Sequence, residues 1–331
     1  MTQKIAFIAT GGTITSIGRG PMDLLDYGSR NERLNAAGLI ARYPEVAGFA
    51  DVIAVDCGSV LSNDVYFPVW KDLAATCARL VAEHADLAGI VICHGTASLE
   101  ETAYVLNLVL KVDVPVVLVG AQRPPSALSS DSGMNIVNAI RTAAAPAARG
   151  MGVMVLLNDE IHAAREVTKT STLRLQTFRS PDFGALGHVD GDKVSFYRAP
   201  LRRHMPGTPF DITTLDALPR VDIAYAYAGV DGAAVRAFVT AGARGIVSAG
   251  FAPGMTTSME TDALVAAARA GVIVVQASRV GSGRVAAMQR LAERGFLHAD
   301  NLNPQKARLL LALALTVTSA PAEIQAFYEE Y

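Results

Sequence analysis

Residues 5–16 of the 331-residue chain read IAFIATGGTITS. The first five are apolar and run directly into Thr10-Gly11-Gly12-Thr13. A short apolar run that ends at glycines predicts a β-strand buried on both faces and then a sharp turn. Because open α/β sheets bind ligands at the carboxyl ends of their strands, we expect the hydroxyls of Thr10 and Thr13 to lie at a ligand site. The alternative is a tight turn with two solvated threonines.

The composition and the glycine pattern exclude several classes of protein. The turn is not G-x-G-x-x-G, and no acidic residue follows at the required spacing, which disfavours a dinucleotide-binding fold. The net charge is −2 and no long run has one sign, so neither nucleic acid nor a membrane surface is an expected partner. The longest apolar run, residues 309–315, is far shorter than the roughly 20 residues that span a bilayer.

The N-terminus and the cysteines favour a cytoplasmic protein. The first strand begins by residue 5, which leaves no room for a signal peptide. The three cysteines are odd in number and widely spaced, as is typical of reduced thiols.

Strands and helices alternate through the first half of the chain. Apolar runs predict strands at 52–55, 89–93, 114–119 and 152–157, and periodic patterns predict helices at 64–83 and 134–145. Between them, Ser98 and Glu101 form a predicted capping box that starts another helix. This alternation predicts a mostly parallel sheet with helices on both faces.

The second half of the chain predicts a further α/β unit. Residues 160–196 are polar and are interpreted as a loop with a β-hairpin, and the proline-rich residues 198–219 as a linker. Strands and helices then alternate again, and Asn303 and Pro304 cap a last helix at 305–316. We therefore predict a larger N-terminal α/β domain, residues 1–197, and a smaller C-terminal one, residues 220–331.

Three predicted strand ends of the first domain carry hydroxyl residues: Thr13, Ser59 and Thr96. On one edge of one sheet they would form a polar pocket. A threonine hydroxyl is a weak nucleophile that needs a base beside it. Lys169 is the best candidate for this base, because desolvation lowers the pKa of a lysine and lets it accept a proton. Its alternative is a solvated loop lysine, and His94 is as readily a structural histidine as a catalyst. The six histidines lack metal-ligand spacing, so we expect no metal and no cofactor.

Several long motifs resemble the bacterial L-asparaginase/glutaminase family, and the resemblance runs essentially end to end. They are Ala9-Thr10-Gly11-Gly12-Thr13-Ile14, His94-Gly95-Thr96, Glu100-Glu101-Thr102-Ala103-Tyr104, Val119-Gly120-Ala121-Gln122-Arg123-Pro124, Val167-Thr168-Lys169-Thr170, Ser278-Arg279-Val280-Gly281 and Asn303-Pro304-Gln305-Lys306-Ala307-Arg308. The resemblance implies two α/β domains and a homotetramer assembled as a dimer of dimers.

The resemblance also implies a catalytic set. It places the nucleophilic threonine at Thr13, on a mobile loop of roughly residues 14–30, and matches Tyr27 to the tyrosine that helps close this loop. Thr96 matches the second catalytic threonine and Lys169 its lysine partner. The implied chemistry is acyl transfer, in which the threonine attacks an amide carbonyl, the amine leaves and water completes the hydrolysis.

The substrate-binding positions match the family less well. Ser59 matches the serine that holds the α-carboxylate of the substrate, and Ala121 a residue whose backbone carbonyl faces the scissile amide. Ala97, however, stands where the family motif has an aspartate that binds the α-ammonium and belongs to the Thr-Lys-Asp relay. Val60 stands where the family usually has a glutamine that contacts the amino-acid head group of the substrate. Met255 stands where the family has an asparagine that supports this head group.

These departures predict a changed substrate. We expect hydrolysis of an amide, lactam, imide or ester without the usual α-amino acid head, because an ammonium buried without partners is costly. One alternative is a genuine L-asparaginase, and a second is a non-catalytic sensor of the same fold. A carboxylate of the substrate, Glu166 or Asp64 could replace the missing aspartate.

Overall fold

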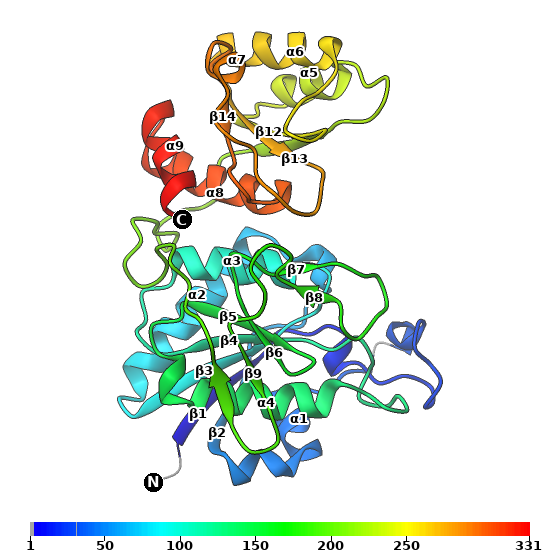
Figure 1. Cartoon of the computed structure of the whole chain (residues 1–331). Helices are drawn as coiled ribbons and strands as arrows, with labels where there is room; N and C mark the ends of the chain where they lie inside the picture. The colour runs from blue at the N-terminus through cyan, green and yellow to red at the C-terminus, as the bar shows by residue number, and fades with distance from the viewer. Residues whose placement is uncertain (1–2, 31) are drawn as a thin grey trace. The chain divides into compact units, whose positions relative to one another are not determined.

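The computed structural model describes residues 3–30 and 32–331 and consists of two units, Met1–Thr208 and Pro209–Tyr331 (Figure 1). The boundary lies inside the stretch 198–219 that the prolines predicted to be a linker. Both units are α/β, the N-terminal one is larger, and parallel strands predominate, so the predicted fold class is confirmed.

Within the described residues, the sheet of the first unit has eight strands. In spatial order they are β10 (Val194–Phe196), β9 (Gly187–Val189), β6 (Glu160–Ala163), β5 (Val153–Leu157), β4 (Val116–Val119), β3 (Leu87–Cys93), β1 (Gln3–Ala9) and β2 (Ala50–Asp56). The run from β5 to β2 is parallel, whereas β6, β9 and β10 pair antiparallel. The carboxyl ends of β1, β2, β3 and β4 therefore meet at one edge.

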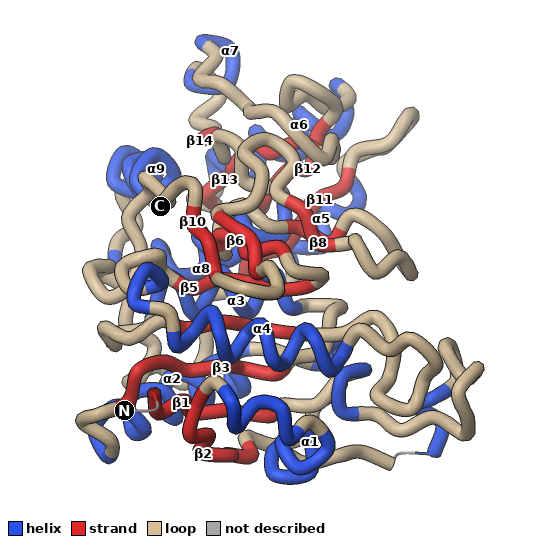
Figure 2. The backbone as a smooth tube through the Cα atoms, turned by 60° about the horizontal axis from the view of Figure 1, so that its bottom comes forward, coloured by secondary structure: helices blue, strands red, loops and turns tan. Residues whose placement is uncertain are grey.

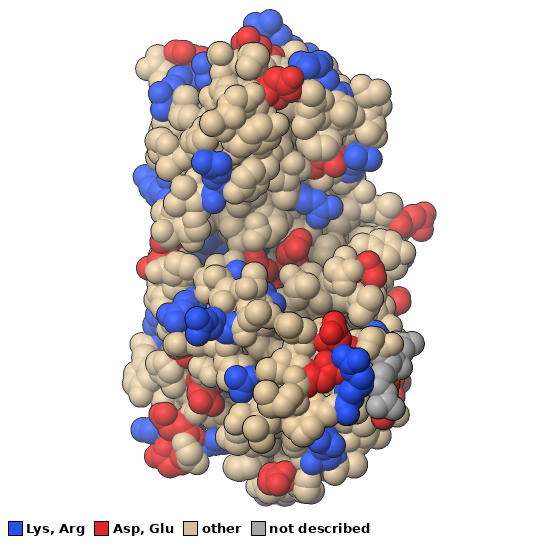
Figure 3. All heavy atoms as spheres, turned by 90° about the vertical axis from the view of Figure 1, so that its right-hand side faces the viewer, with Lys and Arg blue, Asp and Glu red and all other residues tan. Residues whose placement is uncertain are grey.

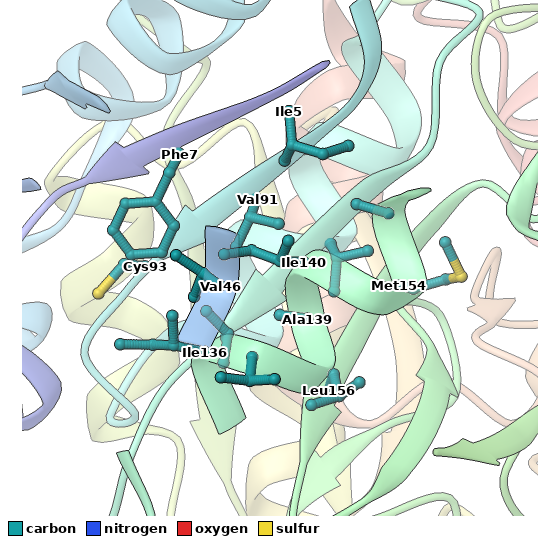
Figure 4. Close-up of a cluster of buried hydrophobic side chains, with 14 of the residues drawn as sticks. Ile5, Phe7, Val46, Val91, Cys93, Ile136, Ala139, Ile140, Met154 and Leu156 are labelled. Carbon is teal, nitrogen blue, oxygen red and sulfur yellow. The ribbon is translucent and has the colours of Figure 1, made fainter. Parts of the chain in front are cut away.

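Four helices cover this sheet. They are α1 (Ala36–Arg42) and α4 (Ser132–Ala144) on one face and α2 (Phe67–Glu83) and α3 (Leu99–Val109) on the other (Figures 1 and 2). Successive side chains of a strand point to opposite faces, so Ile5 and Phe7 of β1 meet Ile136 and Ile140 of α4 in a buried cluster (Figure 4). Ala6 and Ile8, which point to the opposite face, are also fully buried, as the unbroken apolar run at residues 5–9 predicted.

Three local predictions differ from the structure. The helix expected at 64–83 begins only at Phe67, with Pro68 in its first turn, and Ser62–Asp64 forms a separate 3₁₀ turn. The predicted capping box is wrong: Ser98 occupies the N-cap position of α3, but its hydroxyl donates to the Ser62 carbonyl. The polar stretch 160–196 supplies β6, β9 and β10 to the main sheet, beyond the single hairpin expected.

A small separate hairpin completes the first unit. It consists of β7 (Thr168–Lys169) and β8 (Phe178–Arg179), which pair antiparallel. This hairpin carries Lys169.

The second unit has a parallel four-stranded sheet. Its elements are β11 (Val221–Tyr225), α5 (Ala233–Thr240), β12 (Gly245–Gly250), α6 (Ser258–Arg269), β13 (Ile273–Ser278), α7 (Gln289–Ala292), β14 (Leu297–His298), α8 (Pro304–Val317) and α9 (Pro321–Glu330). Helices α5 and α6 cover one face and α8 the other. The Asn303 side chain accepts from the Lys306 N–H at 3.0 Å, which confirms the predicted cap of α8.

Acidic and basic side chains are interspersed on the face shown in Figure 3, without a large field of one sign. Among the residues that the structure describes, no helix is long and apolar enough to cross a membrane.

Candidate active site

The turns that follow β1 and β3 touch through their glycines. Gly12 has φ +93°, and a Cβ atom placed on it would lie 2.2 Å from the Cα atom of Gly95. Only glycine tolerates both the backbone angle and the contact. Thr13 and Thr96 each follow one of these two glycines, so the contact brings the two threonines to the same edge of the sheet.

The turn after β2 joins the same contact. A Cβ atom on Gly11 would lie 2.9 Å from the Val60 carbonyl oxygen, and one on Gly95 would lie 2.6 Å from the Ser62 hydroxyl. The Val60 N–H donates to the Thr10 carbonyl at 3.0 Å. The Thr10 side chain is itself occupied, because its hydroxyl donates to the Cys93 carbonyl at 2.9 Å. The Thr10 hydroxyl therefore ties β1 to β3.

Thr13 opens a 3₁₀ turn, and its hydroxyl faces a tyrosine. Its Oγ1 atom lies 2.6 Å from the Tyr27 hydroxyl oxygen. Thr15 and Ser16 donate to the Gly12 carbonyl, each at 2.9 Å, and hold the turn against the glycine. The loop predicted to be mobile thus places Tyr27 on the Thr13 hydroxyl.

Thr96 meets Lys169. The Lys169 Nζ atom donates to Thr96 Oγ1 at 2.8 Å, and Thr96 is 7% exposed. Burial of the ammonium lowers the pKa of Lys169 from its usual value, while the carboxylate of Glu100 acts in the opposite direction. A lysine with a lowered pKa has more of its neutral amine near neutral pH, and the neutral amine can accept a proton.

The sequence did not single out Glu100, although it lies in the first turn of α3. Glu100 is 5% exposed, and its Oε2 atom accepts from the Lys169 backbone N–H at 2.5 Å. The two carboxylates proposed from the sequence to replace the missing aspartate each have another partner. Glu166 is ion-paired with Arg198 at 2.5 Å, and Asp64 accepts from the exposed Asn63 side chain at 3.2 Å. The spacing of four residues between Thr96 and Glu100 is the signal that could have identified Glu100.

His94 is a structural histidine. Its Nδ1 atom lies 2.8 Å from the Gly95 carbonyl and donates to it, and its Nε2 atom accepts from the Thr102 hydroxyl at 3.1 Å. That hydroxyl in turn accepts from the Trp70 indole N–H at 3.0 Å. Burial lowers the pKa of His94 to about 4, so the ring is neutral near neutral pH and both nitrogens are occupied. Of the two roles that the sequence left open for His94, these hydrogen bonds support the structural one.

The predicted head-group positions are more open. Ser59 is exposed, and its Oγ atom accepts from Arg33 Nη1 at 2.8 Å. Val60 is half-buried and Ala97 is exposed, with its N–H donating to the Ser62 hydroxyl at 3.3 Å. This region therefore presents a cation, Arg33, which the sequence analysis missed because its position depends on the path of the loop after Tyr27.

Two further predicted positions keep their roles as predictions. Ala121 is fully buried two residues beyond β4, as a residue that acts through its backbone would be. Met255 belongs to the second unit, where it exchanges backbone hydrogen bonds with Phe251 across a tight turn.

The fold and the site together define a two-unit α/β protein with paired threonines and a lysine at one sheet edge. Two family models match the chain, "Asparaginase, N-terminal" over residues 4–202 and "Glutaminase/Asparaginase C-terminal domain" over residues 220–328. The chain therefore belongs to the asparaginase/glutaminase family of amidohydrolases.

Individual proteins agree with this assignment. The L-asparaginase 2 of Bacillus subtilis is 41% identical, covering 99% of this chain and 86% of the relative. The probable periplasmic L-asparaginase of Haemophilus influenzae is 40% identical, covering 99% and 93%. A crystal structure of the probable cytoplasmic L-asparaginase of Campylobacter jejuni superposes with a TM-score of 0.94 at 40% identity, covering 99% of this chain and 100% of that one.

Proposed function

We propose that the chain hydrolyses the side-chain amide of L-asparagine, with Thr13 as the nucleophile. The observation that carries this proposal is the 2.8 Å contact of Lys169 Nζ with Thr96 Oγ1, beside the glycine contact that brings Thr13 and Thr96 to one edge. The names of the relatives at about 40% identity support the substrate. This differs from the changed substrate that the sequence departures led us to expect.

The residues suggest a two-step reaction. Thr13 Oγ1 attacks the amide carbon, and its proton passes through Thr96 to the neutral amine of Lys169. The carbon–nitrogen bond breaks as Lys169 returns the proton to the amide nitrogen, which departs as ammonia and leaves an ester on Thr13. Water, activated by the same Thr96–Lys169 pair, then hydrolyses the ester and restores the Thr13 hydroxyl.

The test is ammonia release from a matched pair of amides. L-Asparagine and succinamate share the reacting amide and the carboxylate, and only asparagine has the α-ammonium. We expect ammonia from L-asparagine, together with a transient mass increase on Thr13 that matches the acyl group. Absence of ammonia from L-asparagine, L-glutamine and succinamate would overturn the proposal.

An amide without an α-ammonium is a second candidate substrate, favoured by the composition of the head-group region. Ala97 and Val60 offer no anion to an ammonium, whereas Arg33 and Ser59 offer a cation and a hydroxyl to a carboxylate. A missing charge-assisted hydrogen bond weakens binding by about 1.5–3 kcal/mol, or about 10- to 150-fold. A kcat/KM for succinamate above that for L-asparagine would select this candidate, and the reverse order would exclude it.

Assembly and location also remain proposals. The family resemblance supports a homo-oligomer built as a dimer of dimers, which light scattering of the purified chain would test. The Campylobacter relative is described as cytoplasmic and the Haemophilus relative as periplasmic. We keep the cytoplasmic assignment, which fractionation of the producing cell would check.

A further inference from the structure

Two residues, one in the turn before α3 and one in the first turn of that helix, contact Lys169 at its side chain and at its backbone. Thr96 Oγ1 accepts from the side-chain Nζ atom at 2.8 Å, and Glu100 Oε2 accepts from the backbone N–H at 2.5 Å. Lys169 lies on the short hairpin strand β7, which has only two residues and one partner strand. A strand this short gains little rigidity from its own ladder, so the contacts with α3 fix its place.

We propose that Glu100 is the positioning residue of the site, holding the Lys169 backbone so that Nζ reaches Thr96 and supplying the carboxylate that residue 97 lacks. Glu100 lies three residues after Ala97, within one helical turn of that position. Position 97 is exposed, whereas Glu100 is 5% exposed. The carboxylate of Glu100 is therefore more deeply buried than one at position 97 would be. This inference rests on the proposed catalytic role of Lys169.

The charged side chains around Lys169 identify Glu100 as its electrostatic partner. Arg179 on β8 is exposed and lies opposite Thr168, while Phe178 lies opposite Lys169. In the segment leading to β7, Glu166 is ion-paired with Arg198.

Two further charged side chains lie close by. Arg165 is buried, and its charge lowers the pKa of Tyr104 against the larger effect of burial. Glu101 is half-buried on the next position of α3. Of all these groups, only Glu100 counteracts the burial that lowers the pKa of Lys169.

The position and the charge of Glu100 can be separated experimentally. In Glu100→Gln a side-chain oxygen still accepts from the Lys169 N–H, but the negative charge is gone. The ammonium then loses its anion, so the pKa of Lys169 falls and the base is freed at lower pH. We expect the rising limb of kcat/KM against pH, measured by ammonia release from L-asparagine, to move about one unit to lower pH.

A second readout does not depend on turnover. Acetylation of Lys169 by N-acetoxysuccinimide is followed across pH: the full-length protein is labelled, digested, and the peptide that contains Lys169 is quantified by mass spectrometry. The extent of labelling reports the fraction of neutral amine. We expect the midpoint of labelling to move with the kinetic limb. If the wild type releases no ammonia from any amide, the proposed function fails, while the labelling midpoint still tests Glu100.

The matched control is Glu101→Gln, which removes the same charge one residue away and should leave both midpoints in place. In the double variant Ala97→Asp/Glu100→Gln, a carboxylate at position 97 should return the midpoints toward the wild-type values, a rescue that a purely structural role does not predict. Midpoints for Glu100→Gln equal to those of the wild type would overturn the inference. If Glu100→Gln does not fold, Glu100→Asp decides: unchanged midpoints support the role of the charge, and lowered ones overturn it.

Discussion

The two halves of the site differ in how completely their polar groups are bound. In the catalytic half, Thr13 contacts Tyr27, and Lys169 contacts both Thr96 and Glu100, at distances of 2.5–2.8 Å. In the head-group half, formed by Ser59, Val60, Ala97 and Arg33, one hydrogen bond joins two side chains, that of Arg33 to Ser59. Val60 and Ala97 have apolar side chains and form hydrogen bonds only through their backbone N–H groups in the described structure. This difference supports the proposed division of the site into a part that carries out the reaction and a part that selects the substrate.

This contrast predicts how each half responds to change. A pre-organised network loses most of its function when one member is removed, because the members act together. An open, weakly bonded surface responds in small steps, since each side chain contributes its own contact. Substitutions in the catalytic half should therefore have the larger effects.

The largest effect is expected for Thr13→Ala. Removing the hydroxyl removes the attacking oxygen, so kcat should fall by at least about 10³-fold while the melting temperature changes little. Steady-state ammonia release and thermal unfolding measure the two quantities. Thr13→Ser, which keeps the hydroxyl, is the control and should retain measurable turnover. A Thr13→Ala enzyme with near wild-type kcat would show that the catalytic half has been misplaced.

Lys169→Met should follow, with a loss of about 10²–10³-fold in kcat. The substitution keeps a long apolar stem and removes the base, so activity should no longer rise with pH through the lowered pKa of Lys169. Thr96→Val should give a similar loss, and the double variant little more, because the two residues act as a pair. Fully additive losses in kcat would contradict a shared role.

Gly12→Ala tests the glycine contact on which the catalytic half depends. The new Cβ atom would lie 2.2 Å from the Gly95 Cα atom, at a φ of +93°. The strained angle and the clashing atoms both belong to the backbone, which cannot move aside as a flexible side chain can. The free energy of unfolding should therefore drop by about 3 kcal/mol or more. Urea unfolding measures the change. Gly48→Ala, with no atom within 4 Å of the new Cβ, is the control and should stay within about 0.5 kcal/mol.

The sequence predicted the fold well where burial alone decides it. The apolar runs that end at Gly11 and Gly95 predicted β1 and β3, because strands buried on both faces need no alternation. It predicted less well where tertiary contacts decide. The Ser98 hydroxyl bonds to the Ser62 carbonyl instead of capping its own helix, and β6 joins the main sheet through pairing with distant residues.

The candidate site also divides into residues that the sequence predicted and residues whose place depends on tertiary contacts. Thr13 and Thr96 were predicted at one edge because parallel strands end there, and a touching pair of glycines places them. Glu100 was overlooked because the neighbouring Glu101 fitted a local capping pattern, while the partner of Glu100 lies 69 residues away. Arg33 reaches Ser59 only through the path of a loop that no periodicity describes.

The smallest effect, and the sharpest test of the contrast, is expected in the head-group half from Ala97→Asp. The position is exposed, and a new carboxylate there would give the substrate ammonium a charge-assisted hydrogen bond. We expect kcat/KM for L-asparagine to rise about tenfold relative to succinamate, toward the lower end of what such a bond contributes. Ala97→Asn, with the same shape and no charge, is the control. If both variants leave the ratio unchanged, residue 97 does not face the ammonium, and the open half of the site selects its substrate through Arg33 and Ser59 alone.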